Sequence, residues 1–148
     1  MSERVYVVTD IEVDGFVPGA NSMLALASVA VTASGEQVGE FEAVLAGLPG
    51  AQADPRGWEW FQTQPPEVVA AATAAPRPVA DVMADFVSWV KGPGGGDPAT
   101  FSVHTLPAQW FGDVPHTHRA IDDARGYAHL LVEVLRRSRE RATLPDPA

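Results

Sequence analysis

The chain has 148 residues, no cysteine, and 10 basic against 19 acidic side chains, for a formal net charge of −9 at pH 7. The length fits one domain, and we expect a single domain over residues 1–141 with a frayed tail at 142–148. Without cysteine there are no disulfides, thiolate zinc sites, iron–sulfur clusters or cysteine nucleophiles. The acidic balance excludes a broadly basic surface that coats nucleic acid, but it does not exclude a metal-dependent enzyme acting on nucleic acid.

The N-terminal residues and the longest uncharged stretch indicate where in the cell the protein is expected. The first residues lack the charged start and apolar core of a signal peptide. The uncharged stretch from Gly15 to Gly35 is interrupted by glycine, proline and polar residues. The uninterrupted apolar run within it is therefore too short to span a bilayer. We therefore expect a soluble cytoplasmic protein with no membrane partner.

Three strands are predicted in the first third of the chain. Residues 5–9 are β-branched and aromatic, and residues 23–31 are apolar on both alternating faces, as in a strand covered on both sides. Ser34 and Gly35 form a turn, so residues 37–45 are expected to pair as a hairpin at a sheet edge. A further strand is expected at 100–103.

Three helices are predicted after these strands, at residues 67–75, 78–90 and 120–139. The second has one apolar stripe at helical spacing, made by Val79, Val82, Met83, Phe86, Val87 and Val90. No regular element is predicted for the Pro/Gly-punctuated residues 47–66, and the glycine-rich stretch at 92–96 reads as a linker. Together these elements predict a mixed α/β sheet flanked by helices.

Asp10 and Glu12 directly follow the first strand. Residues two apart in an extended chain point the same way, so these carboxylates share one face and repel each other unless a cation bridges them. Such a pair is typical of a divalent-metal site. The alternative is a solvated strand end, where acidic residues are common.

The second cluster of polar residues is His116-Thr-His118-Arg-Ala-Ile-Asp122-Asp123-Ala124, at the start of the last helix. Both aspartates suit the helix dipole there. Helical periodicity nevertheless separates them, because Asp123 lies on the apolar stripe and Asp122 lies on a polar one. We therefore expect Asp123 to face the sheet, where a lone charge is costly unless it is coordinated, and Asp122 to face water. His116 is interpreted as a structural or solvated histidine.

These two segments resemble the motifs of a known family. Residues 8–15, Val-Thr-Asp-Ile-Glu-Val-Asp-Gly, followed by Asn21-Ser-Met before an apolar strand, look like the first motif of DEDD-type 3′–5′ exonucleases. Residues 116–124 look like the last motif of the histidine-bearing DEDDh branch, His-x4-Asp. The motifs occur in the family's order, with the helix at 78–90 between them.

The resemblance implies a ribonuclease H-like fold, a mixed sheet flanked by helices, and two divalent ions, Mg²⁺ or Mn²⁺. It implies that Asp10 bridges both ions, that Glu12 and Asp123 complete their shells, and that His118 is the general base for the attacking water. The expected activity is release of nucleotides from single-stranded 3′ ends. No group that would read a base or a 2′-hydroxyl is identifiable, so DNA and RNA both remain open as partner, as does the oligomeric state, a homodimer included.

The family's second-motif aspartate has no good match in this chain. Either Gln109 occupies its place, or the middle segment is absent and residues 106–112 already lead into the last motif; the shortness of the chain favours the second reading. Asp97 and Asp113 are the only substitutes nearby. The main alternative function is therefore a catalytically impaired relative that binds nucleic acid or another partner. A different metal phosphoesterase using the same carboxylates is a third option.

Two aromatic or basic groups also have alternative readings. Trp58, Trp60 and Phe61 either stack on nucleobases or pack over the sheet, and packing is favoured. The arginines near the end of the last helix either complement its dipole or steer substrate, and the dipole role is favoured.

Overall fold

The computed structural model describes residues 4–92 and 108–142. In this part of the chain a three-stranded antiparallel sheet has the order β1-β2-β3, with β1 at Val5–Val13, β2 at Met23–Thr32 and β3 at Gln37–Val44. The helices are α1 (Pro55–Gln62), α2 (Pro66–Thr73), α3 (Val79–Lys91) and α4 (Ala120–Ala142), and a short 3₁₀ helix, η1, spans Ala108–Phe111.

The predicted α/β class and all three early strands are therefore confirmed. The first strand, expected at 5–9, continues to Val13, so Asp10 and Glu12 lie within β1 and not after it. A mixed sheet would need a parallel strand, and both strand pairs among the described residues are antiparallel. The strand expected at 100–103 and all but the first residue of the expected tail lie outside the described ranges. The last helix continues to Ala142, about three residues beyond its predicted end.

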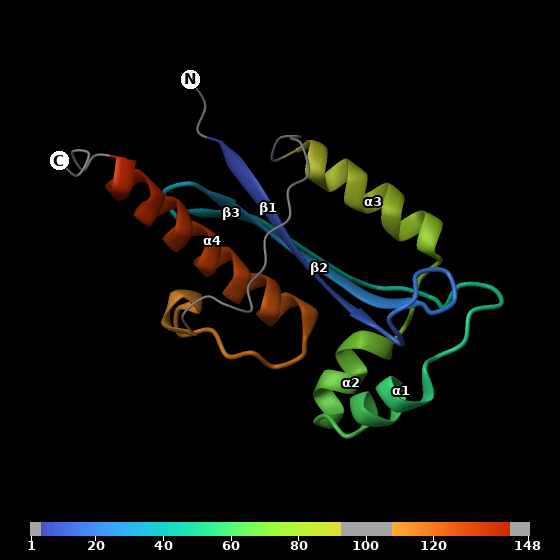
Figure 1. Cartoon of the computed structure of the whole chain (residues 1–148). Coiled ribbons are helices and arrows are strands. Elements are labelled where there is room, and N and C mark those ends of the chain that lie inside the picture. Colours follow the sequence, from blue (N-terminus) through green and yellow to red (C-terminus); the bar gives the residue numbers. More distant parts are fainter. Residues whose placement is uncertain (1–3, 93–107, 143–148) are drawn as a thin grey trace.

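Helices cover both faces of the sheet (Figure 1). From Ala25 onwards the odd-numbered residues of β2 face α4, and Ala25, Ala27, Val29 and Val31 form a buried core there with residues of β1, α1, α2 and α4. The even-numbered residue Leu26 faces the other way and packs with Ala43, Leu45 and the fully buried Val82 of α3. A strand covered on both faces must be apolar throughout, which explains the composition of β2.

The α3 helix matches its predicted stripe only in part. Val82 is fully buried, but Val87 is 49% exposed. In its place Trp89, which the stripe did not include, packs on Phe41 with ring centroids 5.8 Å apart. The indole also lies against Gly39 of β3, where an added Cβ would be in ordinary van der Waals contact with the Trp89 ring, at 3.5 Å.

The α1 helix was not predicted. Its start nevertheless has a helix signature, because Pro55 occupies the first turn and Asp54 caps it. The Asp54 carboxylate accepts hydrogen bonds from the backbone N–H groups of Arg56 and Gly57, at 3.0 and 2.9 Å. This helix carries Trp58 and Trp60 and buries Phe61 in the α4-side core.

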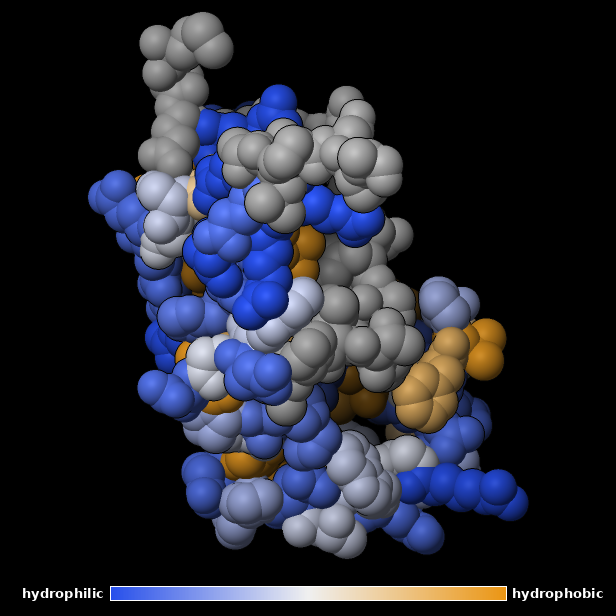
Figure 2. Space-filling model, turned by 60° about the vertical axis from the view of Figure 1, so that its left-hand side comes forward, coloured by the Kyte–Doolittle hydropathy of each residue, from blue (hydrophilic) through white to orange (hydrophobic). Residues whose placement is uncertain are grey.

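The outer side of α4 is polar. Figure 2, turned so that this side of the molecule comes forward, shows a surface dominated by hydrophilic residues. Arg136 pairs with Glu133 and Glu140, Arg137 pairs with Glu133 and lies 4.4 Å over the Trp110 ring, and Arg139 donates to the Ala33 carbonyl. These three arginines thus have partners close to the end of the helix, as expected for residues that stabilise that end. No helix among the described residues is long and apolar enough to cross a membrane.

Candidate metal centre

Three carboxylates converge where β1 ends and α4 begins. Asp10, Glu12 and Asp123 each offer an oxygen, and these oxygens lie within 4.8 Å of one another. Asp10 and Glu12 point to the α4 face because they share the parity of the buried Val8. Asp123 reaches them from the first turn of α4, and its side chain is only 2% exposed. The predicted convergence of the three carboxylates is confirmed.

Small residues make this approach of α4 to the sheet possible. Asp10 and Glu12 lie opposite Ala27 and Ala25 of β2. The facing side of α4 buries further alanines: Ala120, Ala124 and Ala128. Because alanine occupies little space, the helix backbone lies close to the sheet and the short side chain of an aspartate spans the gap. A register shift between Glu12 and Val13 then ends the regular pairing immediately after the second carboxylate.

The cluster is electrostatically unfavourable when it is fully ionised. Burial, together with the nearby Asp123 carboxylate, raises the pKa of Asp10 from 3.8 to about 6. Burial and the charges of Asp10 and Asp123 raise the pKa of Glu12 from 4.5 to about 8. Burial and the same three carboxylates raise the pKa of Tyr127, one turn along α4 from Asp123. A divalent cation would offset this repulsion, so the donors suit Mg²⁺ or Mn²⁺.

Both histidines of the last motif lie beside Asp123. His116 Nδ1 is 3.0 Å from Asp123 Oδ1, and the backbone N–H of Thr117 donates to the same oxygen at 3.1 Å. The His116 and His118 rings meet edge to face with centroids 4.3 Å apart. Each histidine offers a nitrogen within 4.8 Å of the other's and of an Asp123 oxygen. The interpretation of His116 as merely structural or solvated missed this contact, because it depends on how the chain turns into α4.

The backbone at His118 is left-handed, with φ of 60°. For a residue with a side chain this conformation costs free energy, so the surrounding structure must hold it. The turn directly precedes α4, and the backbone N–H groups of Asp122 and Asp123 in the first turn of that helix donate to the Arg119 carbonyl. On the other side the His118 ring meets the edge of Trp60, with ring centroids 4.9 Å apart.

Asp122 does not belong to either group of potential ligands found among the described residues. It accepts a hydrogen bond from Thr117 Oγ1 at 3.0 Å and from Arg125 at 3.2 Å. Arg125 also binds both oxygens of Glu40 on β3, at 2.6 and 2.8 Å. The predicted separation of the two aspartates is therefore present, with Asp122 half-buried in a network that fixes α4 to β3 rather than simply solvated.

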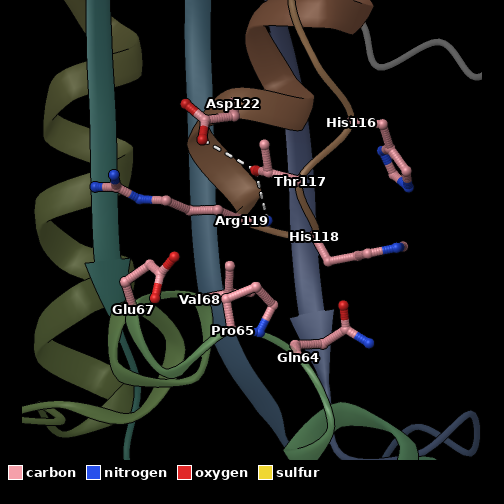
Figure 3. A pocket seen from close by; sticks show the side chains of 9 residues that line it. All are labelled: Gln64, Pro65, Glu67, Val68, His116, Thr117, His118, Arg119 and Asp122. Carbon is pink, nitrogen blue, oxygen red and sulfur yellow. Dashed lines mark hydrogen bonds between the residues drawn. The ribbon is translucent and has the colours of Figure 1, made fainter.

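An open pocket of about 430 Å³ adjoins the histidines. It lies between α4 and the corner that joins α1 to α2, and Figure 3 shows both imidazoles projecting to the side away from Asp122. Its other lining residues are Gln64, Pro65, Glu67, Val68, Thr117, Arg119 and Asp122. His116 and His118 line this pocket and offer nitrogens within 4.8 Å of an Asp123 oxygen, whereas Asp10, Glu12 and Asp123 are not among its lining residues.

The aromatic residues of α1 are Trp58, Trp60 and Phe61. Two of them pack in the core, and the third lies at the surface. Phe61 is buried, and Trp58 stacks on it with ring centroids 5.8 Å apart. Trp60 is half-exposed and touches His118. Packing is thus the role of two of these residues, and only Trp60 remains a candidate for stacking on a nucleobase.

Among the described residues no fourth carboxylate joins Asp10, Glu12 and Asp123. Gln109 and Asp113 are both exposed, and neither belongs to a ligand group among the described residues. Asp97 lies outside the described ranges. Searches against protein-family models and against curated proteins find no match to this chain. Its function must therefore be inferred from these residues and their geometry.

Proposed function

We propose that this chain is a metal-dependent 3′–5′ exonuclease-like phosphodiesterase of the DEDDh type, with a ribonuclease H-like fold. The supporting observation is the convergence of Asp10 and Glu12 from β1 with Asp123 from α4, with His118 beside them. Two segments separated by more than a hundred residues resemble the first and last motifs of that family, and they meet at one place. The proposed substrate is the single-stranded 3′ end of DNA or RNA.

The donor set fits the expected ions. Three carboxylate oxygens in a half-buried place are hard ligands, which Mg²⁺ and Mn²⁺ prefer. Burial and neighbouring carboxylates raise the pKa values of Asp10 and Glu12, and a bound cation would offset this effect. Asp10, Glu12 and Asp123 would hold the ions. When bound, two such ions lower the pKa of water and neutralise charge on the attacking and leaving oxygens of a phosphodiester.

The remaining residues of the site have separable roles. His118 would accept the proton of the attacking water, since a neutral imidazole is a suitable base near pH 7. Its left-handed backbone and its contact with Trp60 fix the direction of the ring. Trp60 would also offer its exposed surface to the terminal base, where stacking contributes about 1–3 kcal/mol.

A second candidate function follows from the number of carboxylates. Only three acidic side chains meet at this place among the described residues, whereas the family uses four. Three carboxylates can hold one ion well and a second one more loosely. A protein of this kind that has lost turnover would serve as a nucleic-acid-binding module with the same fold.

The deciding experiment uses the full chain and a 5′-labelled single-stranded oligonucleotide, as DNA and as RNA. We expect slow stepwise shortening from the 3′ end, faster with Mn²⁺ than with Mg²⁺ and stopped by EDTA. His118→Ala should slow this release about 100-fold or more, as for loss of a general base. His129→Ala is the matched control, because His129 is an exposed histidine of α4 outside both ligand groups, and it should leave the rate unchanged.

Three results would count against the enzyme. EDTA-insensitive cleavage would contradict the metal mechanism, and an unaltered rate in His118→Ala would contradict the assigned base. If neither DNA nor RNA is shortened with either metal, the second candidate function, a nucleic-acid-binding module, is favoured. Fluorescence anisotropy with the same oligonucleotides would then test whether this module binds them.

A further inference from the structure

A second group of metal-binding side chains lies against the first one. His116, His118 and Asp123 each offer one ligand atom, and these atoms lie within 4.8 Å of one another. Asp123 also belongs to the carboxylate group, so the two groups share this one buried side chain. The exonuclease proposal uses His118 as a base and assigns nothing to His116.

The two groups differ in chemistry. The carboxylate group has only oxygen ligands, which suit hard cations. The second group has two imidazoles and one carboxylate, the donor set typical of Zn²⁺ and other divalent transition ions. His116 is 59% exposed on its side chain, so an ion can reach the group from solvent.

The distances are close to those that such an ion requires. Tetrahedral zinc ligands at 2.0–2.2 Å from the ion lie about 3.3 Å from each other. His116 Nδ1 and Asp123 Oδ1 are already 3.0 Å apart. The Thr117 N–H holds that oxygen in place at 3.1 Å, which is how a hydrogen bond orients a ligating carboxylate. The centroid of the His118 ring is 4.3 Å from that of His116, and the ligand atoms of His118, His116 and Asp123 all lie within 4.8 Å of one another.

We propose that His116, His118 and Asp123 form a second metal site, specific for a divalent transition ion of the Zn²⁺ type and separate from the carboxylate site for Mg²⁺ or Mn²⁺. Zinc would replace the direct contact between His116 Nδ1 and Asp123 Oδ1 and would bind a nitrogen of His118. Where the proposed exonuclease activity holds, zinc occupancy therefore removes the general base and inhibits nucleotide release.

Zinc binding is tested directly, without substrate, by calorimetric titration of the full chain with Zn²⁺. We expect His116→Ala to weaken Zn²⁺ binding at least tenfold, since even indirect support of a ligand contributes that much. The same variant should keep its stabilisation by Mn²⁺. His129→Ala should bind Zn²⁺ like the wild type, and the exposure of His116 makes loss of folding in His116→Ala unexpected.

The reciprocal variant separates the two sites. The double change Asp10→Asn and Glu12→Gln leaves the histidine group intact, so it should keep Zn²⁺ binding while it loses the response to Mn²⁺. In NMR spectra of that variant, Zn²⁺ should shift the ring signals of His116 and His118 but not those of His129.

Other outcomes would overturn the zinc site and still leave the nuclease proposal standing. If His116→Ala binds Zn²⁺ as tightly as the wild type, the ion lies elsewhere. If the double variant loses Zn²⁺ binding, the carboxylates hold the zinc. Failure of the exonuclease assay alone would not affect either titration.

Discussion

The two faces of the sheet differ in whether charged side chains are buried on them. On the α3 face the contacts are mainly apolar and aromatic, with Val82 fully buried and Phe41 packed between Phe86 and Trp89. On the α4 face the apolar core runs into three carboxylates near the end of β1. The α3 face thus gains stability from burial alone, whereas the α4 face contains groups whose burial opposes folding.

This difference points to the α4 face of the sheet as the functional side of the molecule. Nothing in packing requires Asp10, Glu12 and Asp123 to meet, and the raised pKa values of Asp10 and Glu12 indicate that the folded protein disfavours the charges of these two residues. Charged groups that are clustered at a cost to stability are characteristic of active sites. Adding a charge to the α3 face should therefore lower the stability of the protein. Removing charge from the α4 face should raise the stability of the metal-free protein.

The largest effect is expected from adding a charge to the α3 face. Val82→Asp places a carboxylate at a fully buried position with no cation beside it, so the free energy of unfolding should fall by about 3–5 kcal/mol. Val87→Asp, on the same helix but 49% exposed, is the control and should stay within about 0.5 kcal/mol of the wild type. Urea denaturation measures both. Equal midpoints for the two variants would show that α3 does not cover the sheet.

Removal of charge from the α4 face should have the opposite sign. Asp10→Asn combined with Asp123→Asn removes like-charge repulsion, so the melting temperature of the metal-free protein should rise. Wild-type protein should gain about 2.7 kcal/mol when free Mn²⁺ is 100-fold above its dissociation constant, and the double variant should gain nothing. Thermal melts with and without millimolar Mn²⁺ compare the two. A wild-type shift no larger than that of the variant would disprove the metal centre.

The smallest effect is a pH dependence of the metal-free protein. Because the pKa of Glu12 rises from 4.5 to about 8 on folding, the folded state retains a proton that the unfolded state has lost between these values. Stability should therefore decrease as pH rises from about 4.5 towards 8. Glu12→Gln should show a flatter profile over this range, and comparison with the wild type cancels other titrating groups. Identical profiles for the two proteins would contradict the buried position of Glu12.

The elements with strong periodicity were predictable from sequence. The strands β1 to β3 and the helices α2 to α4 follow from alternation, apolar runs and helical stripes, because burial is decided by these patterns. The facing of Asp123 towards the sheet followed in the same way. The α1 helix was missed although Asp54 and Pro55 mark its start, because the surrounding prolines and glycines were read as loop signals.

Contacts between separate elements were less accessible from the sequence. His116 was not recognised as a partner of Asp123, because that contact depends on the left-handed turn at His118. The role of Trp89 was missed because it depends on the contact with Phe41 of β3, a separate element. Both cases involve a neighbour that becomes adjacent only after the chain has folded, and periodicity within one element contains no information about it.

The shared position of Asp123 has a thermodynamic consequence. If an ion in the carboxylate group changes the affinity of the histidine group for zinc by some factor, zinc must change the affinity for that first ion by the same factor. One side chain, 2% exposed and belonging to both groups, would thus make the occupancy of each site depend on the concentration of the other site's metal as well as on that of its own.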